Sequence, residues 1–190
     1  MSEAERDAVV LPDRPGAPGG ELTRLRWCRD GAPPVVFTHA TGMCASAYSQ
    51  FLAPLSADFD ITAPDMRGHG RSGLPPTGRT LNNWQVYARD IEAMLLARDQ
   101  PADGWRLMGH SMGSVTALLV AAAGRVQVSR LVLIEPVIVP AWVRLLAQTP
   151  AVRILQRRMP IANRARKRRK SSPTNRTLLP VSYSVRRKTA

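Results

Sequence analysis

The chain has 190 residues, 44% of them hydrophobic, and a formal net charge of +13, which suits one domain with a buried core and excludes a disordered composition. Apolar runs stay below the roughly 20 residues of a membrane span, and no basic stretch precedes an apolar one, so we expect neither a span nor a signal peptide. The two cysteines, Cys28 and Cys44, do not make a disulfide framework, and we expect a cytoplasmic protein.

The positive charge is concentrated in the C-terminal part. Residues 136–190 contain 14 of the 27 Lys and Arg and no Asp or Glu, which leaves residues 1–135 with 13 basic against 14 acidic residues. The run RARKRRK at 164–170 could bind phosphates, so nucleic-acid binding through this tail is one alternative function. The run has no aromatic residue to stack on bases, and such runs are more often solvated. We therefore expect no nucleic-acid partner.

Hydrophobic periodicity predicts alternating strands and helices. Residues 1–20 begin acidic and become rich in Pro and Gly, and are expected to form a flexible leader. Strands are expected at 21–28, 35–39, 60–65, 105–110 and 128–136, and helices at 45–57, 81–99 and 112–124. Pro54 counts against an uninterrupted helix at 45–57. The alternation predicts an α/β fold with a mostly parallel sheet and helices on both faces.

The segment GHSMGS at 109–114 lies where a predicted strand ends and a predicted helix begins. Gly109 and Gly113 leave room for a very sharp turn that would hold the Ser111 hydroxyl exposed at its tip. The free amides of the following helix favour negative charge at the same place. The pattern indicates a nucleophile elbow formed by Gly109, His110, Ser111 and Gly113. The alternative is a tight turn whose serine caps the helix.

The segment THATGM at 38–43 follows the predicted strand at 35–39 and would form a loop beside the elbow. We expect the backbone amides of Thr41 and Met112 to act as an oxyanion hole. His39 is expected to fix the loop by a hydrogen bond rather than to act in catalysis. Neither a cofactor nor a metal is expected.

Three segments, VVFTHATGM, DITAPDMRGHGRS and GHSMGS, resemble the α/β-hydrolase family in this order, over about residues 22–136. HATG departs from the His-Gly that many members carry. Epoxide hydrolases and haloalkane dehalogenases of this fold have Asp where this chain has Ser111, so the chain resembles the serine-dependent, esterase-like members. The resemblance implies that Ser111 attacks the carbonyl carbon of a small-molecule ester or a related compound, and that water completes the reaction.

The base for Ser111 is missing from the place that the resemblance implies. In this family the order is Ser, then Asp or Glu, then His, but His39, His69 and His110 all precede Ser111. The only carboxylate after Ser111 is Glu135, at the end of the strand predicted at 128–136, and it is a possible acid. We therefore expect the catalytic machinery to be incomplete.

The predicted organisation has four parts. The leader is followed by the N-terminal part of a hydrolase core at 21–136, lid-like helices at 137–160 and an irregular basic tail at 161–190. Because the family's last strands do not follow, we interpret the chain as a truncated or frame-shifted member. A base supplied by a second subunit stays open, and the oligomeric state is not predicted. A further alternative is a non-catalytic fragment or a binding protein on a hydrolase scaffold.

Overall fold

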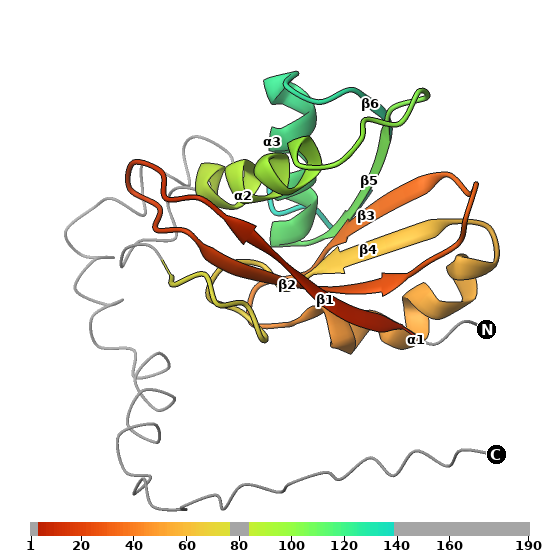
Figure 1. Ribbon diagram of the computed structural model, residues 1–190, viewed down its shortest axis with the longest axis horizontal. Helices are drawn as coiled ribbons and strands as arrows, with labels where there is room; N and C mark the ends of the chain where they lie inside the picture. The colour runs from red at the N-terminus through yellow and green to blue at the C-terminus, as the bar shows by residue number, and fades with distance from the viewer. Residues whose placement is uncertain (1–3, 77–83, 139–190) are drawn as a thin grey trace, which may run out of the picture. The chain divides into compact units, whose positions relative to one another are not determined.

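The computed structural model describes residues 4–76 and 84–138, which build a six-stranded sheet covered by helices on both faces (Figure 1). The strands are β1 (Glu5–Leu11), β2 (Gly20–Trp27), β3 (Pro34–Thr38), β4 (Asp60–Pro64), β5 (Trp105–His110) and β6 (Val128–Ile134). Their order is β1-β2-β4-β3-β5-β6. β4, β3, β5 and β6 run parallel, whereas β2 is antiparallel to both β1 and β4. The carboxyl ends of β3, β5 and β6 therefore meet at one edge of the sheet.

Helices on the two faces bury separate apolar clusters. The helices α2 (Gln85–Leu96) and α3 (Met112–Ala123) lie on one side in Figure 1, and α1 (Ser49–Leu52) lies on the other. Fully buried side chains under α2 and α3 include Leu22, Val36, Ile91, Met94, Leu95, Trp105, Leu107 and Val120. Buried side chains on the α1 side include Leu25, Trp27, Val35, Phe37, Leu52, Ile61 and Ala63. This arrangement confirms the predicted α/β fold with helices on both faces.

The helix predicted at 45–57 is broken into three pieces. The 3₁₀ helix η1 (Ala45–Tyr48) leads into α1, and the 3₁₀ helix η2 (Ala53–Ala57) follows it. Pro54 lies in the first turn of η2, and its ring nitrogen has no hydrogen to donate to a preceding carbonyl. The proline therefore ends the α-helical hydrogen bonding that the apolar spacing alone predicts.

The prediction of a flexible leader at 1–20 is wrong for the part that forms β1. All seven residues from Glu5 to Leu11 pair with β2 in antiparallel register. Asp7, Val9 and Leu11 alternate toward the protein while their neighbours are exposed, as in an edge strand that packs on one face. The acidic, Pro- and Gly-rich composition of residues 1–20 does not indicate a strand, because strand formation here depends on pairing with residues 20–26.

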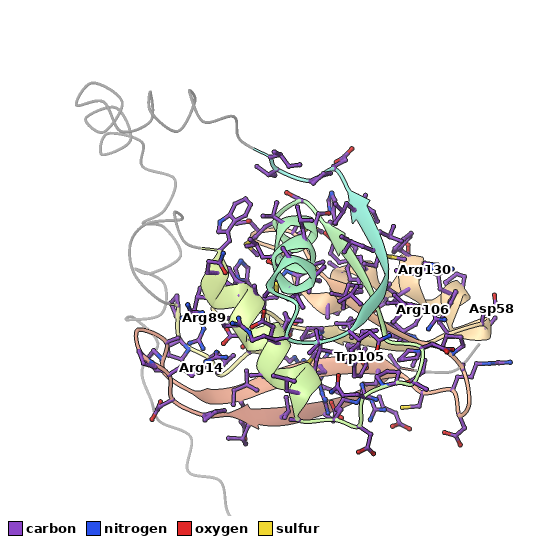
Figure 2. All side chains as sticks on the ribbon, turned by 90° about the horizontal axis from the view of Figure 1, so that it is seen from above. Arg14, Asp58, Arg89, Trp105, Arg106 and Arg130 are labelled. Carbon is purple, nitrogen blue, oxygen red and sulfur yellow. The ribbon has the colours of Figure 1, made fainter. Side chains whose placement is uncertain are left out.

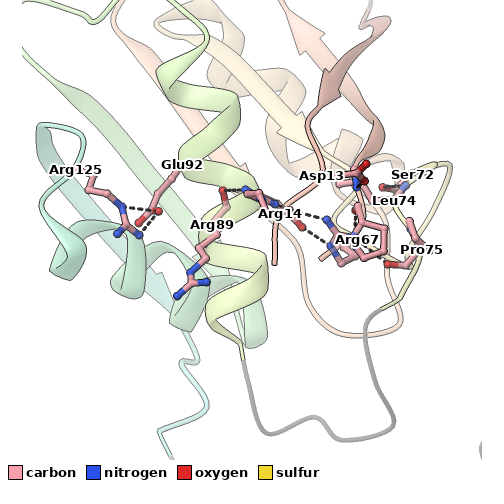
Figure 3. Close-up of polar contacts among 12 residues, drawn as sticks. Asp13, Arg14, Arg67, Ser72, Leu74, Pro75, Arg89, Glu92 and Arg125 are labelled. Atoms are coloured by element: carbon pink, nitrogen blue, oxygen red, sulfur yellow. Dashed lines mark hydrogen bonds and ion pairs between the residues drawn. The ribbon is translucent and has the colours of Figure 1, made fainter. Parts of the chain in front are cut away.

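A buried ion-pair cluster joins three parts of the chain (Figure 3). Asp90 of α2 accepts hydrogen bonds from Arg67 at 2.7 and 2.9 Å and also pairs with Arg14. Arg67 is completely buried and donates further hydrogen bonds to the carbonyls of Pro18 (2.7 Å) and Pro75 (3.0 Å). The connection between β1 and β2, the loop after β4 and α2 are thereby held against one another.

At the end of the sheet where β5 and β6 begin, a buried tryptophan lies near two arginines (Figure 2). Trp105 is buried there, and its indole nitrogen donates to the Gln100 side chain at 2.9 Å. Arg106 and Arg130 are register partners on β5 and β6. These basic side chains lie near the amino ends of the strands, away from the loops that follow β3, β5 and β6.

The predicted lid-like helices at 137–160 and the basic tail at 161–190 lie outside the described residues, except for 137 and 138. Among the described residues, no helix has the length and apolar character needed to cross a membrane.

Candidate active site

Ser111 lies at a sharp turn between β5 and α3, as the sequence predicts. Its backbone has φ 54° and ψ −113°, a conformation that L-residues rarely adopt and that costs about 1–3 kcal/mol. The Ser111 N–H donates to the carbonyl of Ile134 at 2.9 Å, which ties the turn to the end of β6. The side chain makes no capping hydrogen bond to α3. The alternative of a helix-capping serine is therefore wrong, and the hydroxyl is not committed to the helix.

The two glycines of the elbow are required by close backbone contacts. A Cβ on Gly113 would overlap the carbonyl oxygen of Thr38, and one on Gly109 would overlap the backbone of Gly113. The Thr38 hydroxyl donates to the Gly113 carbonyl at 2.8 Å. The elbow is thus packed directly on the end of β3, and this contact sets where Ser111 lies relative to the loop after β3.

Ser114 is a structural member of the site that the sequence reasoning missed. Its side chain is completely buried, and its Oγ lies 2.5 Å from the Gly109 carbonyl oxygen and 2.8 Å from the Ile134 carbonyl oxygen. The same hydroxyl accepts the Ile134 N–H at 3.0 Å. Ser114 therefore joins the ends of β5 and β6 beneath the elbow. The only signal in the sequence is its place three residues after Ser111.

The loop after β3 makes a tight turn beside the elbow. The Met43 N–H donates to the Ala40 carbonyl at 3.2 Å, and Gly42 has φ 77°, as the third residue of a type II turn requires. Thr41 therefore lies at the second position of this turn. Its hydroxyl contacts the Met112 sulfur at 3.2 Å. The structure thus brings together the two residues whose amides the sequence analysis selects.

His39 is completely buried, and its ring hydrogen-bonds to Ala40, the first residue of this turn. Its Nδ1–H donates to the Ala40 carbonyl at 2.8 Å, and its Nε2 accepts the Met66 N–H at 2.9 Å. Only the neutral ring satisfies both contacts. Desolvation lowers the pKa of His39 to about 4, so the ring is uncharged at neutral pH. Both nitrogens are occupied, which agrees with the expected loop-fixing role.

His110 is held between two side chains from other elements. Its Nδ1 lies 2.6 Å from the Tyr48 hydroxyl, and its Nε2 lies 3.4 Å from the Glu135 carboxylate. Glu135 follows β6 with φ 46°, and its side chain is 85% exposed. Nothing in the sequence indicates Tyr48 as part of the site, because it lies 62 positions before its partner.

His69 packs against the ring of His39. Its Nδ1–H donates to the Arg67 carbonyl at 2.8 Å, and its ring packs against His39 and Tyr87 with centroid distances of 5.2 and 6.2 Å. Within the described ranges, none of the three histidines makes a hydrogen bond with Ser111. In the same residues, no three His, Cys, Asp or Glu side chains gather as metal ligands.

A family model described as serine aminopeptidase, S33, matches residues 32–182. The chain belongs to this family of α/β hydrolases. Among curated relatives, the chain is 39% identical over 111 residues to a non-heme chloroperoxidase of Streptomyces lividans, covering 57% of this chain and 38% of the relative. It is 30% identical over 133 residues to a monoglyceride lipase of Mus musculus, covering 67% of this chain and 43% of the relative. The chain spans about two fifths of the length of these relatives.

Solved α/β-hydrolase structures share the fold. A probable hydrolytic enzyme from Pseudomonas aeruginosa superposes with a TM-score of 0.64 at 21% identity, covering 90% of this chain and 53% of that one. A thioesterase domain from the curacin biosynthetic pathway superposes with a TM-score of 0.58 at 22% identity, covering 88% and 62%. The family model confirms the family predicted from the three sequence segments, and these structures confirm the fold.

Proposed function

We propose that this chain is a serine hydrolase in which Ser111 attacks the carbonyl carbon of an ester. The observation that carries the proposal is the strained backbone of Ser111 at the junction of β5 and α3, with a hydroxyl that does not cap the helix. Strained conformations cluster at functional sites because the surrounding structure must hold them. Here Gly113, Ser114 and Ile134 hold it through the contacts described above.

The amides of Thr41 and Met112 are the proposed oxyanion hole. Met112 is the first residue of α3, whose leading amides have no partner within the helix. The contact between the Thr41 hydroxyl and the Met112 sulfur supports placing Thr41 on the same side of Ser111. Each well-placed donor stabilises the tetrahedral intermediate by about 3–4 kcal/mol.

Glu135 is the proposed acid of the site. Among the described residues, Ser111 and Glu135 are the two non-glycine residues with positive φ. The Ser111 N–H donates to the carbonyl of Ile134, the residue before Glu135, so the two strained residues are close in space. The Glu135 side chain also contacts His110. Strain at both strand ends is consistent with two side chains presented to one reaction site.

Among residues 4–76 and 84–138, no histidine is placed to accept the Ser111 proton in the proposed mechanism. His110 is engaged at both ring nitrogens, His39 is buried and engaged at both, and His69 faces Arg67. Ser111 then adds to the ester carbonyl while water takes its proton, and the C–O bond to the alkoxide breaks as water returns a proton to that oxygen. A second water adds to the acyl-serine, the acyl–Oγ bond breaks, and the acid is released as Ser111 Oγ regains a proton from water. Oxyanion stabilisation and binding without a complete triad leave a rate only about 10³–10⁴-fold above the uncatalysed reaction.

The proposed substrate class is a small ester or a related carbonyl compound. The names monoglyceride lipase and non-heme chloroperoxidase belong to relatives that this chain matches over part of their length. An activated aryl ester is therefore the substrate for a first test. Its good leaving group lowers the need for a general acid.

The test is steady-state hydrolysis of an aryl ester by the full chain, by Ser111→Ala and by separate Asn variants of the three histidines. We expect slow hydrolysis that Ser111→Ala removes and that His69→Asn and His110→Asn leave within a few-fold of the wild type. A folded His69→Asn or His110→Asn variant as inactive as Ser111→Ala would identify a base and contradict the proposal, whereas His39→Asn reports on the turn that His39 holds. Equal rates for the wild type and Ser111→Ala would favour the non-catalytic alternative.

A further inference from the structure

We propose that Tyr48 is a positioning residue that holds the turn carrying Thr41 in register with the elbow. The inference rests on the proposed function, because the place of Thr41 matters only if its amide faces the Ser111 reaction. Tyr48 is the last residue of η1. Its hydroxyl accepts the Ala40 N–H at 3.2 Å and also lies 2.6 Å from His110 Nδ1.

The hydrogen on the Tyr48 hydroxyl has one favoured acceptor. In the neutral His110 ring, the tautomer with its hydrogen on Nε2 donates to the Glu135 carboxylate oxygen, and Nδ1 is left as an acceptor. Tyr48 then donates to Nδ1 at 2.6 Å rather than to the Met43 sulfur at 3.2 Å, because a thioether is a weak acceptor. A lone pair of the same oxygen is then free for the Ala40 N–H.

Together these hydrogen bonds hold both the N–H and the carbonyl of Ala40. The Ala40 N–H is held by Tyr48, and the Ala40 carbonyl is held by His39 Nδ1–H and by the Met43 N–H. Ala40 is the first residue of the turn, and Thr41 follows it directly. Tyr48 and His39 therefore determine where the Thr41 amide points, and Tyr48 connects that turn to His110, the residue before Ser111.

The Tyr48 ring is itself held in place. It packs against Phe37 of β3 with a centroid distance of 4.7 Å, and Phe37 is completely buried. It also meets the His110 ring edge-on at 5.8 Å. Removing only the hydroxyl, as in Tyr48→Phe, should keep this packing and isolate the hydrogen-bonding role.

The test compares Ser111 phosphonylation by a fluorophosphonate in the wild type, Tyr48→Phe and Tyr87→Phe. Tyr87 is the matched control, because it is also half-buried but its ring contacts His69 instead of the elbow. We expect Tyr48→Phe to lower the maximal labelling rate about tenfold at unchanged inhibitor affinity, less than the roughly 10²–10³-fold that loss of a donor itself costs. Tyr87→Phe should label as the wild type does.

Amide hydrogen exchange of Ala40 gives a readout that does not need activity. We expect its N–H to be protected in the wild type and in Tyr87→Phe, and to exchange faster in Tyr48→Phe while the core amides of β5 stay protected. Wild-type labelling by Tyr48→Phe, a change in inhibitor affinity alone, or unchanged Ala40 exchange would overturn the inference and leave the proposed function standing. Failure of the wild type to label at Ser111 would overturn the proposed function and this inference with it.

Discussion

Acid should weaken the fold through His39, the buried histidine behind the turn that carries Thr41. Burial lowers the pKa of His39 from 6.5 to about 4. Between these pH values the unfolded chain binds a proton that the folded chain does not, so the free energy of unfolding falls as the pH falls. Above pH 6.5 the ring is neutral in both states and the contribution is fully present.

The size of the effect follows from the two pKa values. One pH unit of difference corresponds to about 1.4 kcal/mol, so the interval from 6.5 to about 4 is worth about 3 kcal/mol in all, and about 2 kcal/mol by about pH 5. The physical cause is visible in the structure: a proton on Nε2 would face the Met66 N–H across 2.9 Å, leaving two donors opposed. Small domains have only about 5–15 kcal/mol of stability, so the loss should be measurable.

The assay is urea unfolding from about pH 7.5 to about pH 5, for the wild type and for His39→Gln, whose side chain stays uncharged. All groups other than residue 39 are common to the two proteins, so their contributions cancel in the difference between the two stability curves. We expect the wild type to lose about 2 kcal/mol more than the variant over this range. Parallel stability curves for the two proteins would refute the argument that His39 is buried in its neutral form.

Two further substitutions test the contacts that hold the site. Asp90→Asn should lower the free energy of unfolding by about 3–5 kcal/mol in thermal or urea melts, because it leaves the buried Arg67 without its charge partner. The same change at Asp7, whose side chain is 36% exposed beside Arg24, should cost less than about 1 kcal/mol, and equal losses would contradict the reasoning. Ser114→Ala should cost about 1–3 kcal/mol and slow labelling of Ser111, since it removes the link between the ends of β5 and β6. The control, Ser129→Ala, loses only long contacts of 3.3 and 3.4 Å, and a loss as large as that of Ser114→Ala would count against this role.

The elbow could be predicted from the sequence because its causes are local. A strand, two glycines around Ser111 and a helix of small residues lie within about twenty positions, and the turn that they imply is the turn observed. The type II turn at Ala40–Met43 is similarly local, since Gly42 supplies the positive φ. Parallel strands then place these loops at one edge of the sheet.

The features that escaped prediction depend on distant partners. β1 is a strand because β2 pairs with it, and the sequence of residues 5–11 alone does not predict that pairing. Tyr48 reads as part of an amphipathic stretch, yet its hydroxyl meets His110, which follows 62 positions later. Asp90 is a charged residue on a helix, and its burial is favourable because Arg67 and Arg14, which lie in other loops, form ion pairs with it.

The central claim is that Ser111 is the nucleophile, and the most direct measurement is the site and stoichiometry of fluorophosphonate labelling by mass spectrometry. We expect one adduct per chain, located by peptide mapping at Ser111 and absent from Ser111→Ala. An adduct on another residue, or equal labelling of Ser111→Ala, would contradict the account.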